Sequence, residues 1–272
     1  MRPITIPPDI RALDKKAAAF KTEINAIAQN FKRLYAANPD ISIVIPAWNE
    51  EENILKTLCS LSKTSSRYSI EVIVVDNNST DATGELATAA GVMCIKETKQ
   101  GITNARNAGL AAAKGKYIIN ADADTIYPSA WIDDMVTPLM QNEAIALTYG
   151  KFAFIPLEGT SRFSYFIFEH LADFSRTLNR LFKEEAVNVY GFNSACRREQ
   201  CLAVDGFNHP PGTNEDGFLA MKLRDKGFGK LYCMRRKRSI VWTTDRRILI
   251  DGGFRKAFFK RITKEFNRFF KS

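Results

Sequence analysis

The sequence predicts an α/β fold: a mostly parallel sheet flanked by helices, with an N-terminal helical extension and a C-terminal amphipathic helix. Its 272 residues are 45% hydrophobic and 25% charged, which suits a globular chain with a sizeable core and excludes disordered, collagen-like and disulfide-scaffold proteins. Between residues 40 and 120, short apolar runs alternate with helical patterns, as in parallel sheets. Residues 235–272 hold 13 Lys+Arg and 3 Asp+Glu, so the net charge of +9 lies in a basic tail behind a neutral body.

The first element is a helix over residues 11–37, because apolar residues recur there at spacings of three and four. Asn38-Pro39-Asp40 ends it, since the residue before a proline avoids the helical conformation. The apolar stripe packs on its own domain or on a second copy of the chain, so a homo-oligomer through residues 11–37 stays an alternative. The stripe consists of Leu13, Ala17, Phe20, Ile24, Ile27, Phe31 and Leu34.

Four strands and three helices then alternate. The apolar runs at 41–45, 70–75, 92–95 and 117–120 predict strands, and the segments 50–62, 81–90 and 103–114 predict helices. Gly115 follows the last of these helices as an expected C-cap. Ligands of such sheets bind at the carboxyl ends of the strands, so the residues just after each strand are the candidate site.

The loop after the first strand excludes two nucleotide-binding classes. Pro46, Asn49 and Glu50 stand there, and Glu51 and Glu52 follow. A dinucleotide-binding fold needs a glycine-rich turn at this place, and three glutamates would repel a pyrophosphate. The sequence therefore argues against a Rossmann dehydrogenase, and it holds no P-loop motif.

Carboxylates follow the second and fourth strands. Asp76, directly after a strand, is expected to contact a ligand, whereas Asp81 is more simply a helix cap. Asp122 and Asp124 leave the fourth strand side by side, which is costly unless a cation neutralises them. Hard oxygen ligands suit Mg²⁺ or Mn²⁺, ions that usually carry substrate phosphates as well. The alternative is an acidic turn that only ends the strand.

Taken in chain order, these segments resemble glycosyltransferase family 2 of the bacterial type, over about residues 40–245. The resemblance implies the GT-A fold and transfer of a sugar, with inversion, from a nucleotide donor. It divides the chain into residues 1–39, a nucleotide-sugar half at 40–150, an acceptor and catalytic half at 151–245, and a tail at 246–272. The motifs are Ile43-Val-Ile-Pro46-Ala-Trp-Asn49-Glu50, Val74-Val-Asp76-Asn-Asn-Ser-Thr-Asp81, Gly101-Ile-Thr-Asn-Ala-Arg106-Asn107-Ala-Gly109, Asp122-Ala-Asp124, Gly191-Phe-Asn, Asp205-Gly206-Phe207 and Asn214-Glu215-Asp216.

The resemblance also implies roles for these residues. Asp124, with Asp122, would hold Mn²⁺ or Mg²⁺ against the diphosphate, and Asp122 would contact the ribose or the metal's water shell. Asp216, with Glu215 beside it, would take the proton of the acceptor hydroxyl, although Asn214-Glu215-Asp216 also reads as a helix N-cap. The donor-binding set would be Pro46, Asn49, Glu50, Asp76 for the base, Arg106 for the polar edge of the nucleotide, and Asp122.

One departure from the family concerns the metal. Many relatives place a histidine near the end of the fold, but residues 241–247 contain none. Thr243, Thr244, Asp245 or water would complete the coordination instead, or Arg246 and Arg247 would pair with the diphosphate.

Two further helices are expected on the acceptor side. Residues 161–182 carry an apolar stripe that includes Phe163, Ile167, Phe174 and Leu181. It reads as a core helix, with His170 a core histidine, or as an apolar wall for a lipid-linked acceptor. Residues 252–271 place Phe on one face and Lys and Arg on the other, as in helices that lie on anionic membranes. A helix docked on the core and a nucleic-acid patch are the alternatives, and the neutral body argues against nucleic acid.

The remaining composition bears on location. The five cysteines have no zinc-like spacing, so we expect free thiols and no metal–thiolate site. With no signal-like segment and no apolar run near 18 residues, we expect a cytoplasmic enzyme, peripheral at the inner face of the membrane. Its expected activity is glycosyl transfer, such as hexosyl transfer from a UDP-sugar to a lipid-linked saccharide of a cell-surface polysaccharide. A nucleotidyltransferase and an inactive scaffold are the alternatives.

Overall fold

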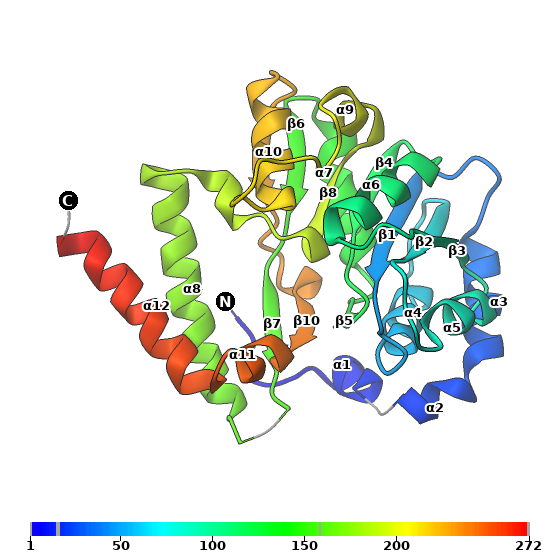
Figure 1. Cartoon of the computed structure of the whole chain (residues 1–272), viewed down its shortest axis with the longest axis horizontal. Coiled ribbons are helices and arrows are strands. Elements are labelled where there is room, and N and C mark those ends of the chain that lie inside the picture. The colour runs from blue at the N-terminus through cyan, green and yellow to red at the C-terminus, as the bar shows by residue number, and fades with distance from the viewer. Residues whose placement is uncertain (1, 15–16, 158, 271–272) are drawn as a thin grey trace.

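A seven-stranded sheet forms the centre of the molecule (Figure 1). The computed structural model describes residues 2–14, 17–157 and 159–270, with side chains in the last helix described at 253–261 and 263. The strand order is β3-β2-β1-β4-β8-β6-β9, and β8 runs antiparallel to both of its neighbours. The strands are β1 (Ile41–Ala47), β2 (Ile70–Asp76), β3 (Met93–Lys96), β4 (Tyr117–Asn120), β6 (Ile145–Tyr149), β8 (Ser194–Arg197) and β9 (Lys230–Cys233).

Helices cover both faces of this sheet, so the predicted α/β class is confirmed. Successive side chains of β1 alternate between two cores: Ile43 and Ile45 join one, and Val44 joins the other. The first core is shared with α4 (Ile54–Ser62), α5 (Thr83–Ala89) and α7 (Trp131–Gln141). The second is shared with α6 (Ile102–Ala112), α9 (Arg198–Ala203) and α10 (Glu215–Asp225).

A smaller sheet joins the middle of the chain to its C-terminal part. β5 (Thr125–Ile126), β10 (Val241–Thr244) and β7 (Phe152–Ile155) pair in the order β5-β10-β7. Because β10 lies beside β5, the residues that follow β10 come close to the loop after β4. The second half of the chain also supplies β8 and β9 to the large sheet, so the division at residue 150 stays a functional prediction.

The N-terminal extension is three helices rather than the predicted single one. They are α1 (Pro8–Leu13), α2 (Ala17–Lys21) and α3 (Ile24–Leu34). All three pack against α4, which a straight helix of that length could not do. Phe20, Ile27 and Phe31 are buried there, so the main residues of the stripe considered for self-association lie in the chain's own core.

Two local expectations are wrong. Gly115 is not a C-cap, because α6 ends at Ala112; a Cβ at Gly115 would lie 2.5 Å from the backbone nitrogen of Ser42. Glycine is needed there for the close approach to β1. Cys196 and Cys201 are joined in a disulfide, whereas Cys59, Cys94 and Cys233 are free, so the expectation of five free thiols fails for that pair.

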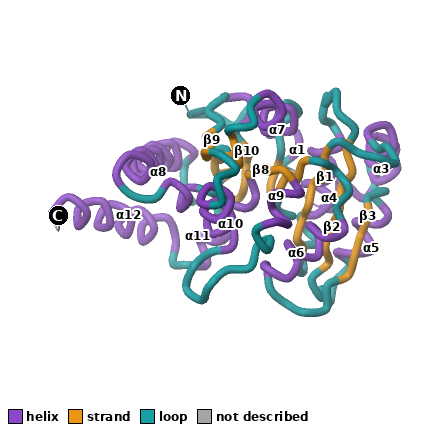
Figure 2. Tube along the Cα trace, turned by 90° about the horizontal axis from the view of Figure 1, so that it is seen from above, coloured by secondary structure: helices purple, strands orange, loops and turns teal. Residues whose placement is uncertain are grey.

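Two long helices form an arm at the end of the molecule away from α3 (Figures 1 and 2). They are α8 (Arg162–Phe182) and α12 (Gly253–Phe270), and the short α11 (Arg246–Ile250) leads into α12. The predicted helix at 161–182 is therefore confirmed, and the one at 252–271 is confirmed over the described residues, with Lys271 lying outside them. The core interpretation of the α8 stripe is wrong, because Phe163, Phe174 and His170 on that stripe are exposed. No helix of the described residues is both long and apolar enough to cross a membrane.

Candidate active site

A cavity of about 330 Å³ lies at the carboxyl ends of β1 and β4. These two strands are neighbours at the centre of the sheet, and the chain leaves them in loops that form opposite walls. The tail closes the cavity from a third side through α11. The lining residues are Pro46, Ala47, Trp48, Glu50, Asn77, Gln100, Gly101, Ile102, Ala105, Asp122, Ala123, Asp124, Arg246 and Arg247.

The loop that carries Asp122 and Asp124 is fixed from below. The backbone N–H of Asp122 donates to the Tyr127 hydroxyl at 2.8 Å, and that hydroxyl donates to the carbonyl of Phe192 at 3.1 Å. The Thr57 hydroxyl lies 2.8 Å from the carbonyl oxygen of Ala123 and 2.9 Å from that of Thr125. Both carboxylates therefore project into the cavity from a rigid loop.

Arg106 lies beneath the cavity and joins its two sides. Its side chain is 2% exposed, and its Nη2 donates to Asp122 Oδ1 at 3.1 Å. Its Nε lies 3.3 Å from Asp216 Oδ1 and 3.8 Å from Glu215 Oε1. One guanidinium thus links a carboxylate after β4 with carboxylates on α10, where the resemblance implied a contact to the nucleotide.

Asp216 accepts a hydrogen bond at one carboxylate oxygen and is paired with Arg106 at the other. The Gly191 N–H donates to its Oδ2 at 2.6 Å, whereas Oδ1 is buried and accepts no hydrogen bond from the described residues. Burial raises the pKa of Asp216 to about 6, although Arg106 works against it. Burial likewise raises the pKa of Asp122 to about 6. Asn214 caps α10 by accepting from the Gly217 N–H at 2.8 Å. The N-cap residue and the candidate base Asp216 therefore lie in the same first turn of α10.

Arg246 occupies the acidic side of the cavity. Its Nη2 lies 3.0 Å from Asp124 Oδ2 and 2.5 Å from Glu50 Oε1. Of the alternatives at the end of the fold, Asp245 is fully buried and turned elsewhere. It accepts from the Leu157 N–H at 3.0 Å and the Tyr165 hydroxyl at 2.6 Å.

The residues around Asp124 fit a divalent cation that is bound largely by substrate and water. Among the described residues, no three His, Cys, Asp or Glu side chains cluster as a metal site. Asp122 and Asp124 offer hard carboxylate oxygens, and Asp124 already attracts a positive charge, that of Arg246. Mg²⁺-type ions need no more than one or two carboxylates when phosphates complete the shell.

The other candidate residues brace the loops. Asn49, at φ 52°, accepts from the Thr80 N–H at 2.9 Å and so ties the loop after β1 to the loop after β2. Asp81 accepts from the N–H groups of Thr83 and Glu51, one residue before the N-cap of α5, which is Ala82. Asp76 accepts from the Ser79 N–H at 3.0 Å and lies outside the cavity lining, whereas Asn77 is part of it.

Three residues of the site were not predicted. A Cβ on Gly191 would lie 2.1 Å from Arg106 Nη2 and 2.3 Å from Asp216 Oδ1, so only glycine fits between them. Tyr127 anchors Asp122, and Trp48 lines the cavity with 55% of its surface exposed. Trp48 and Gly191 had a signal in the sequence, since both stand in segments that resemble the family. Tyr127 had none, because its hydroxyl is held by the carbonyl of Phe192, far away in the chain.

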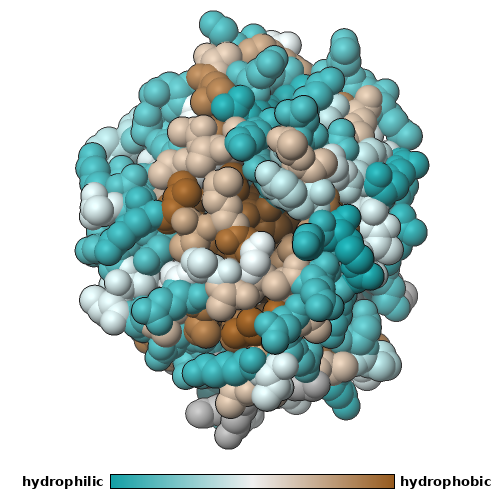
Figure 3. Space-filling view, turned by 90° about the vertical axis from the view of Figure 1, so that its right-hand side faces the viewer, coloured by the Kyte–Doolittle hydropathy of each residue, from teal (hydrophilic) through white to brown (hydrophobic). Residues whose placement is uncertain are grey.

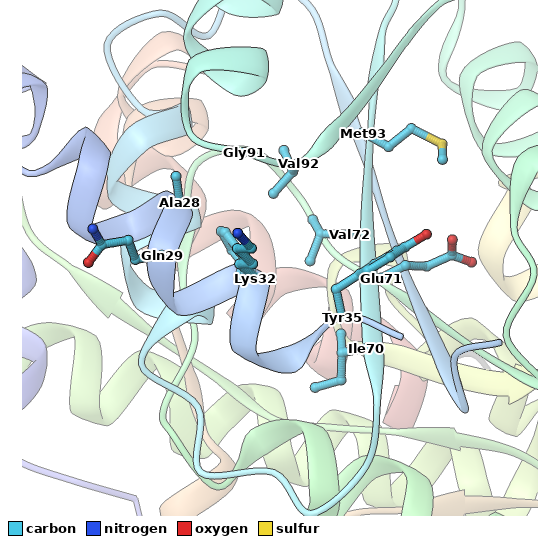
Figure 4. Close-up of a pocket in the computed structure, with 11 residues that line it drawn as sticks. Ala28, Gln29, Lys32, Tyr35, Ile70, Glu71, Val72, Gly91, Val92 and Met93 are labelled. Atoms are coloured by element: carbon cyan, nitrogen blue, oxygen red, sulfur yellow. The ribbon is translucent and has the colours of Figure 1, made fainter. Parts of the chain in front are cut away.

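A second cavity, of about 450 Å³, lies at the opposite edge (Figure 4). It is formed by α3 and the strands β2 and β3, on the side where Figure 3 shows hydrophobic residues around a hollow. Its lining includes Ile70 and Val72 at the amino end of β2, and its one carboxylate, Glu71, bonds to Ser42 and Lys114. The chemistry-bearing side chains gather in the smaller cavity.

Comparison with known proteins shows the family. Glycosyl transferase family 2 matches residues 42–202, and the chain belongs to this family. It is 28% identical over 169 residues to glycosyltransferase AglE of Haloferax volcanii, covering 56% of this chain and 55% of that protein. It is 32% identical over 117 residues to an Escherichia coli protein named UDP-Glc:alpha-D-GlcNAc-diphosphoundecaprenol beta-1,3-glucosyltransferase WfaP. That match covers 41% of this chain and 45% of that protein. The matches thus span about half the length of these two relatives.

Solved structures of similar fold are GT-A glycosyltransferases. Glucosyl-3-phosphoglycerate synthase of Mycobacterium tuberculosis, in complex with Mn²⁺, UDP-glucose and phosphoglyceric acid, superposes with a TM-score of 0.52 at 24% identity, over 77% of this chain and 72% of that one. The mannosyltransferase PcManGT of Pyrobaculum calidifontis, in complex with GDP-Man and Mn²⁺, superposes with a TM-score of 0.57 at 19% identity. The match covers 86% of this chain and 68% of that one. The predicted family and the predicted fold are therefore confirmed.

Proposed function

We propose that this glycosyltransferase transfers a sugar, with inversion, from a nucleoside-diphosphate donor to a hydroxyl of a saccharide acceptor. The observation that carries the proposal is the Arg106 bridge, which places Asp122 at the cavity and Asp216 beside it around one buried charge. Asp122 lies on the donor side and Asp216 on the acceptor side, and both contact the guanidinium of Arg106. This arrangement suits a single displacement, in which the acceptor hydroxyl attacks the sugar as the diphosphate leaves.

In this mechanism Asp216 is the general base. Its Oδ1 accepts the proton of the acceptor hydroxyl, whose oxygen forms the new bond to the anomeric carbon as the bond to the diphosphate oxygen breaks. The N–H of Gly191 and the guanidinium of Arg106 keep that carboxylate oriented. With a pKa of about 6, Asp216 is mostly ionised at neutral pH and still basic enough to hold the proton.

The donor site would use the residues of the cavity. Asp124, with Asp122, would hold Mn²⁺ or Mg²⁺, which supplies Lewis-acid neutralisation of the leaving diphosphate. Arg246 and Arg247 would pair with diphosphate oxygens, while Pro46 and Glu50 of the lining would shape the nucleotide side. Asn49 and Asp76 would support it from the loops behind the lining. Trp48 offers an exposed aromatic face on which a base can stack.

The choice of substrates rests on relatives. Similar structures hold UDP-glucose or GDP-Man with Mn²⁺, and the name of WfaP specifies a UDP-sugar donor and a diphosphoundecaprenol-linked acceptor. We propose a UDP-sugar donor and a lipid-linked saccharide acceptor of a cell-surface polysaccharide.

The test is calorimetric binding of UDP, GDP, dTDP and ADP, each with and without Mn²⁺. We expect one diphosphate to bind with Mn²⁺ and its binding to be lost in Asp124→Ala. Asp225→Ala removes an exposed carboxylate on α10 and serves as the matched control, with binding unchanged. If no diphosphate binds under any metal condition, the donor site is wrong, and the chain is better described as a scaffold built on this fold.

A further inference from the structure

A groove of about 320 Å³ lies between the two helices of the arm. α8 and α12, which lie side by side in Figures 1 and 2, form its walls, and the 3-10 helix η1 (Glu185–Asn188) and Tyr190 also line it. Three of its lining residues are cationic, and none of those that the structure describes is acidic. The cations are Arg176 on α8 and Lys260 and Arg261 on α12. A groove with this lining favours an anionic ligand.

The carboxylates near the groove do not balance these charges. Asp173 lies 3.2 Å from Arg176, but it also pairs with Arg2 and Lys151, at 2.8 and 2.7 Å. One carboxylate therefore meets three cations. Lys260 pairs with no carboxylate among the residues that the structure describes. Like charges gathered in this way repel one another, and a bound anion would relieve that repulsion.

Arg176 is fixed in a position from which it can bind such an anion. Its side chain is 13% exposed, and its guanidinium lies 5.0 Å from the centre of the Phe152 ring and 5.3 Å from that of Tyr190. Within the described part of the chain, only Asp173 accepts a hydrogen bond from this guanidinium, which carries several N–H donors. Arginine pairs with phosphate oxygens bidentately, so a guanidinium held by two rings is preorganised for a phosphate.

Apolar side chains separate the cations. The guanidinium of Arg261 lies 4.7 Å from the centre of the Phe168 ring. A smaller cavity, of about 180 Å³, shares two of the cations and Phe168 with the groove and adds Phe154 and Ile248 of α11. Its one acid, Glu169, already pairs with a cation at 2.8 Å. Cations set among apolar side chains suit an anionic group that carries a hydrocarbon chain.

The groove lies close to the candidate base. η1 packs against α8 on one side and against α10 on the other. Tyr190, which lines the groove, directly precedes Gly191, whose N–H donates to Asp216 Oδ2 at 2.6 Å. At the other end, Ile248 of the smaller cavity directly follows Arg247 of the donor cavity. A ligand in the groove is therefore next to the acceptor side of the site.

We propose that the groove between α8 and α12 binds a phosphate or diphosphate ester of the acceptor. Arg176, Lys260 and Arg261 meet its oxygens, and the hydrocarbon next to it lies on the apolar lining. The acceptor is then a saccharide joined through phosphate to an apolar chain, rather than a neutral oligosaccharide. The assignment to the acceptor rests on the proposed function, whereas the anion site itself does not. A membrane phospholipid has the same chemistry and is the other source that the experiment separates.

The experiment is calorimetric binding of farnesyl diphosphate to the full chain in EDTA, which keeps metal out of the donor cavity. We expect binding that weakens as salt rises. Lys260→Gln/Arg261→Gln should bind at least about tenfold more weakly, because charge-assisted contacts are lost. Lys260→Glu changes one exposed side chain and should weaken binding as well. Arg255→Gln/Lys256→Gln removes two exposed cations of the same helix outside the groove and, as the matched control, should bind as the wild type does.

Phosphatidylglycerol vesicles and UDP complete the test. The vesicles should not displace farnesyl diphosphate; displacement would assign the groove to a membrane phospholipid and overturn the acceptor assignment. UDP with Mn²⁺ should bind equally to the wild type and to Lys260→Gln/Arg261→Gln. If UDP binds but farnesyl diphosphate does not, or if the groove variants bind farnesyl diphosphate like the wild type, the groove proposal alone is overturned. If farnesyl diphosphate binds but no nucleoside diphosphate does, the proposed function fails, and the acceptor assignment fails with it.

Discussion

At the scale of single residues, the site is a compact arrangement of charges around a buried guanidinium. Arg106 is buried among Asp122, Glu215 and Asp216 and forms ion pairs with all three. Carboxylates in such surroundings hold their protons more tightly, because burial disfavours the charged form. Burial raises the pKa of Asp216 and so makes it a stronger base, whereas the guanidinium of Arg106 favours the ionised form of that carboxylate.

Asp216→Asn should abolish most of the transfer activity. The amide cannot accept the hydroxyl proton, so we expect kcat to fall by about 10³-fold, within the range for general-base catalysis. Diphosphate binding with Mn²⁺ should be unchanged, as calorimetry on the same samples would show. Glu215→Gln is the control and should cost much less; a larger loss in Glu215→Gln would move the base to Glu215.

The activity should also have an acidic limb near pH 6 rather than pH 4. Because burial raises the pKa of Asp216 to about 6, the carboxylate is protonated and inactive as the pH falls through that value. We expect kcat/KM to drop about tenfold per pH unit below it. Measuring diphosphate binding over the same range separates the base from the donor site. A limb that appears in binding but not in kcat would contradict the assignment.

Arg246→Ala should change metal and nucleotide binding in opposite directions. Without the guanidinium, Asp124 loses its competing cation, so Mn²⁺ alone should bind more tightly. The diphosphate in the presence of Mn²⁺ should bind about tenfold more weakly, because a charge-assisted contact is lost. Arg247→Ala is the control for the first effect and should leave the affinity for Mn²⁺ alone unchanged. Unaltered Mn²⁺ binding in Arg246→Ala would show that the two cations do not compete.

At the scale of elements, three segments distant in sequence must meet for the site to exist. Arg106 comes from α6, Asp216 from the first turn of α10, and Gly191 from the short 3-10 helix η2 (Gly191–Asn193). η2 packs between the other two so closely that no side chain fits. The strands hold the donor loops, but the acceptor side depends on this contact between a helix, a helix end and a turn.

Gly191→Ala should separate these elements. Its methyl group would overlap Arg106 and Asp216, so the carboxylate must move away from the guanidinium. We expect a loss of about 1–3 kcal/mol in the free energy of unfolding, typical of overpacking, measured by urea titration. We also expect a fall in kcat out of proportion to any change in nucleotide binding. Wild-type kcat in this variant would mean that the observed approach of η2 is not required.

At the scale of the whole molecule, the chain's beginning fastens the arm to the body. Arg2 is 3% exposed and donates to both oxygens of Asp173 on α8, at 2.9 and 2.8 Å, and to the carbonyl of Phe152 on β7. Burial works to raise the pKa of Asp173, but the bonds to Arg2 and Lys151 outweigh it and hold that pKa well below its usual range. The ion pairs of Asp173 thus hold α8 to the body of the molecule.

Arg2→Ala should weaken this anchor. Removing one partner of a buried ion pair leaves Asp173 and Glu169 undercompensated, so we expect a loss of about 3 kcal/mol in the free energy of unfolding. A carboxyl whose pKa is depressed by folding stabilises the protein above the unfolded pKa and loses that contribution as the pH falls. The difference between variant and wild type should therefore shrink below pH 3.8. Arg11→Ala, at an exposed position, is the control; equal stability of both variants would contradict the anchor.

The sequence by itself determined the order of strands and helices and the edge at which the candidate residues gather. Parallel strands share one carboxyl edge, so Glu50, Asp122 and Asp124 could be placed at one cavity from local patterns. Asp76 was expected there on the same argument, yet its carboxylate is used within its own loop, because local hydrogen bonds decide where a short side chain turns.

Only the tertiary structure decided the partners of each face and each charge. The periodicity of the sequence revealed the apolar stripe of α8 but not that the helix buries its other side. An apolar stripe shows which residues share a face of a helix, but not which element packs against that face. The same holds for Arg106 between Asp122 and Asp216, for Arg246 on Asp124 and for Gly115 against β1. These contacts join residues far apart in the chain, and their geometry follows from packing the whole molecule at once.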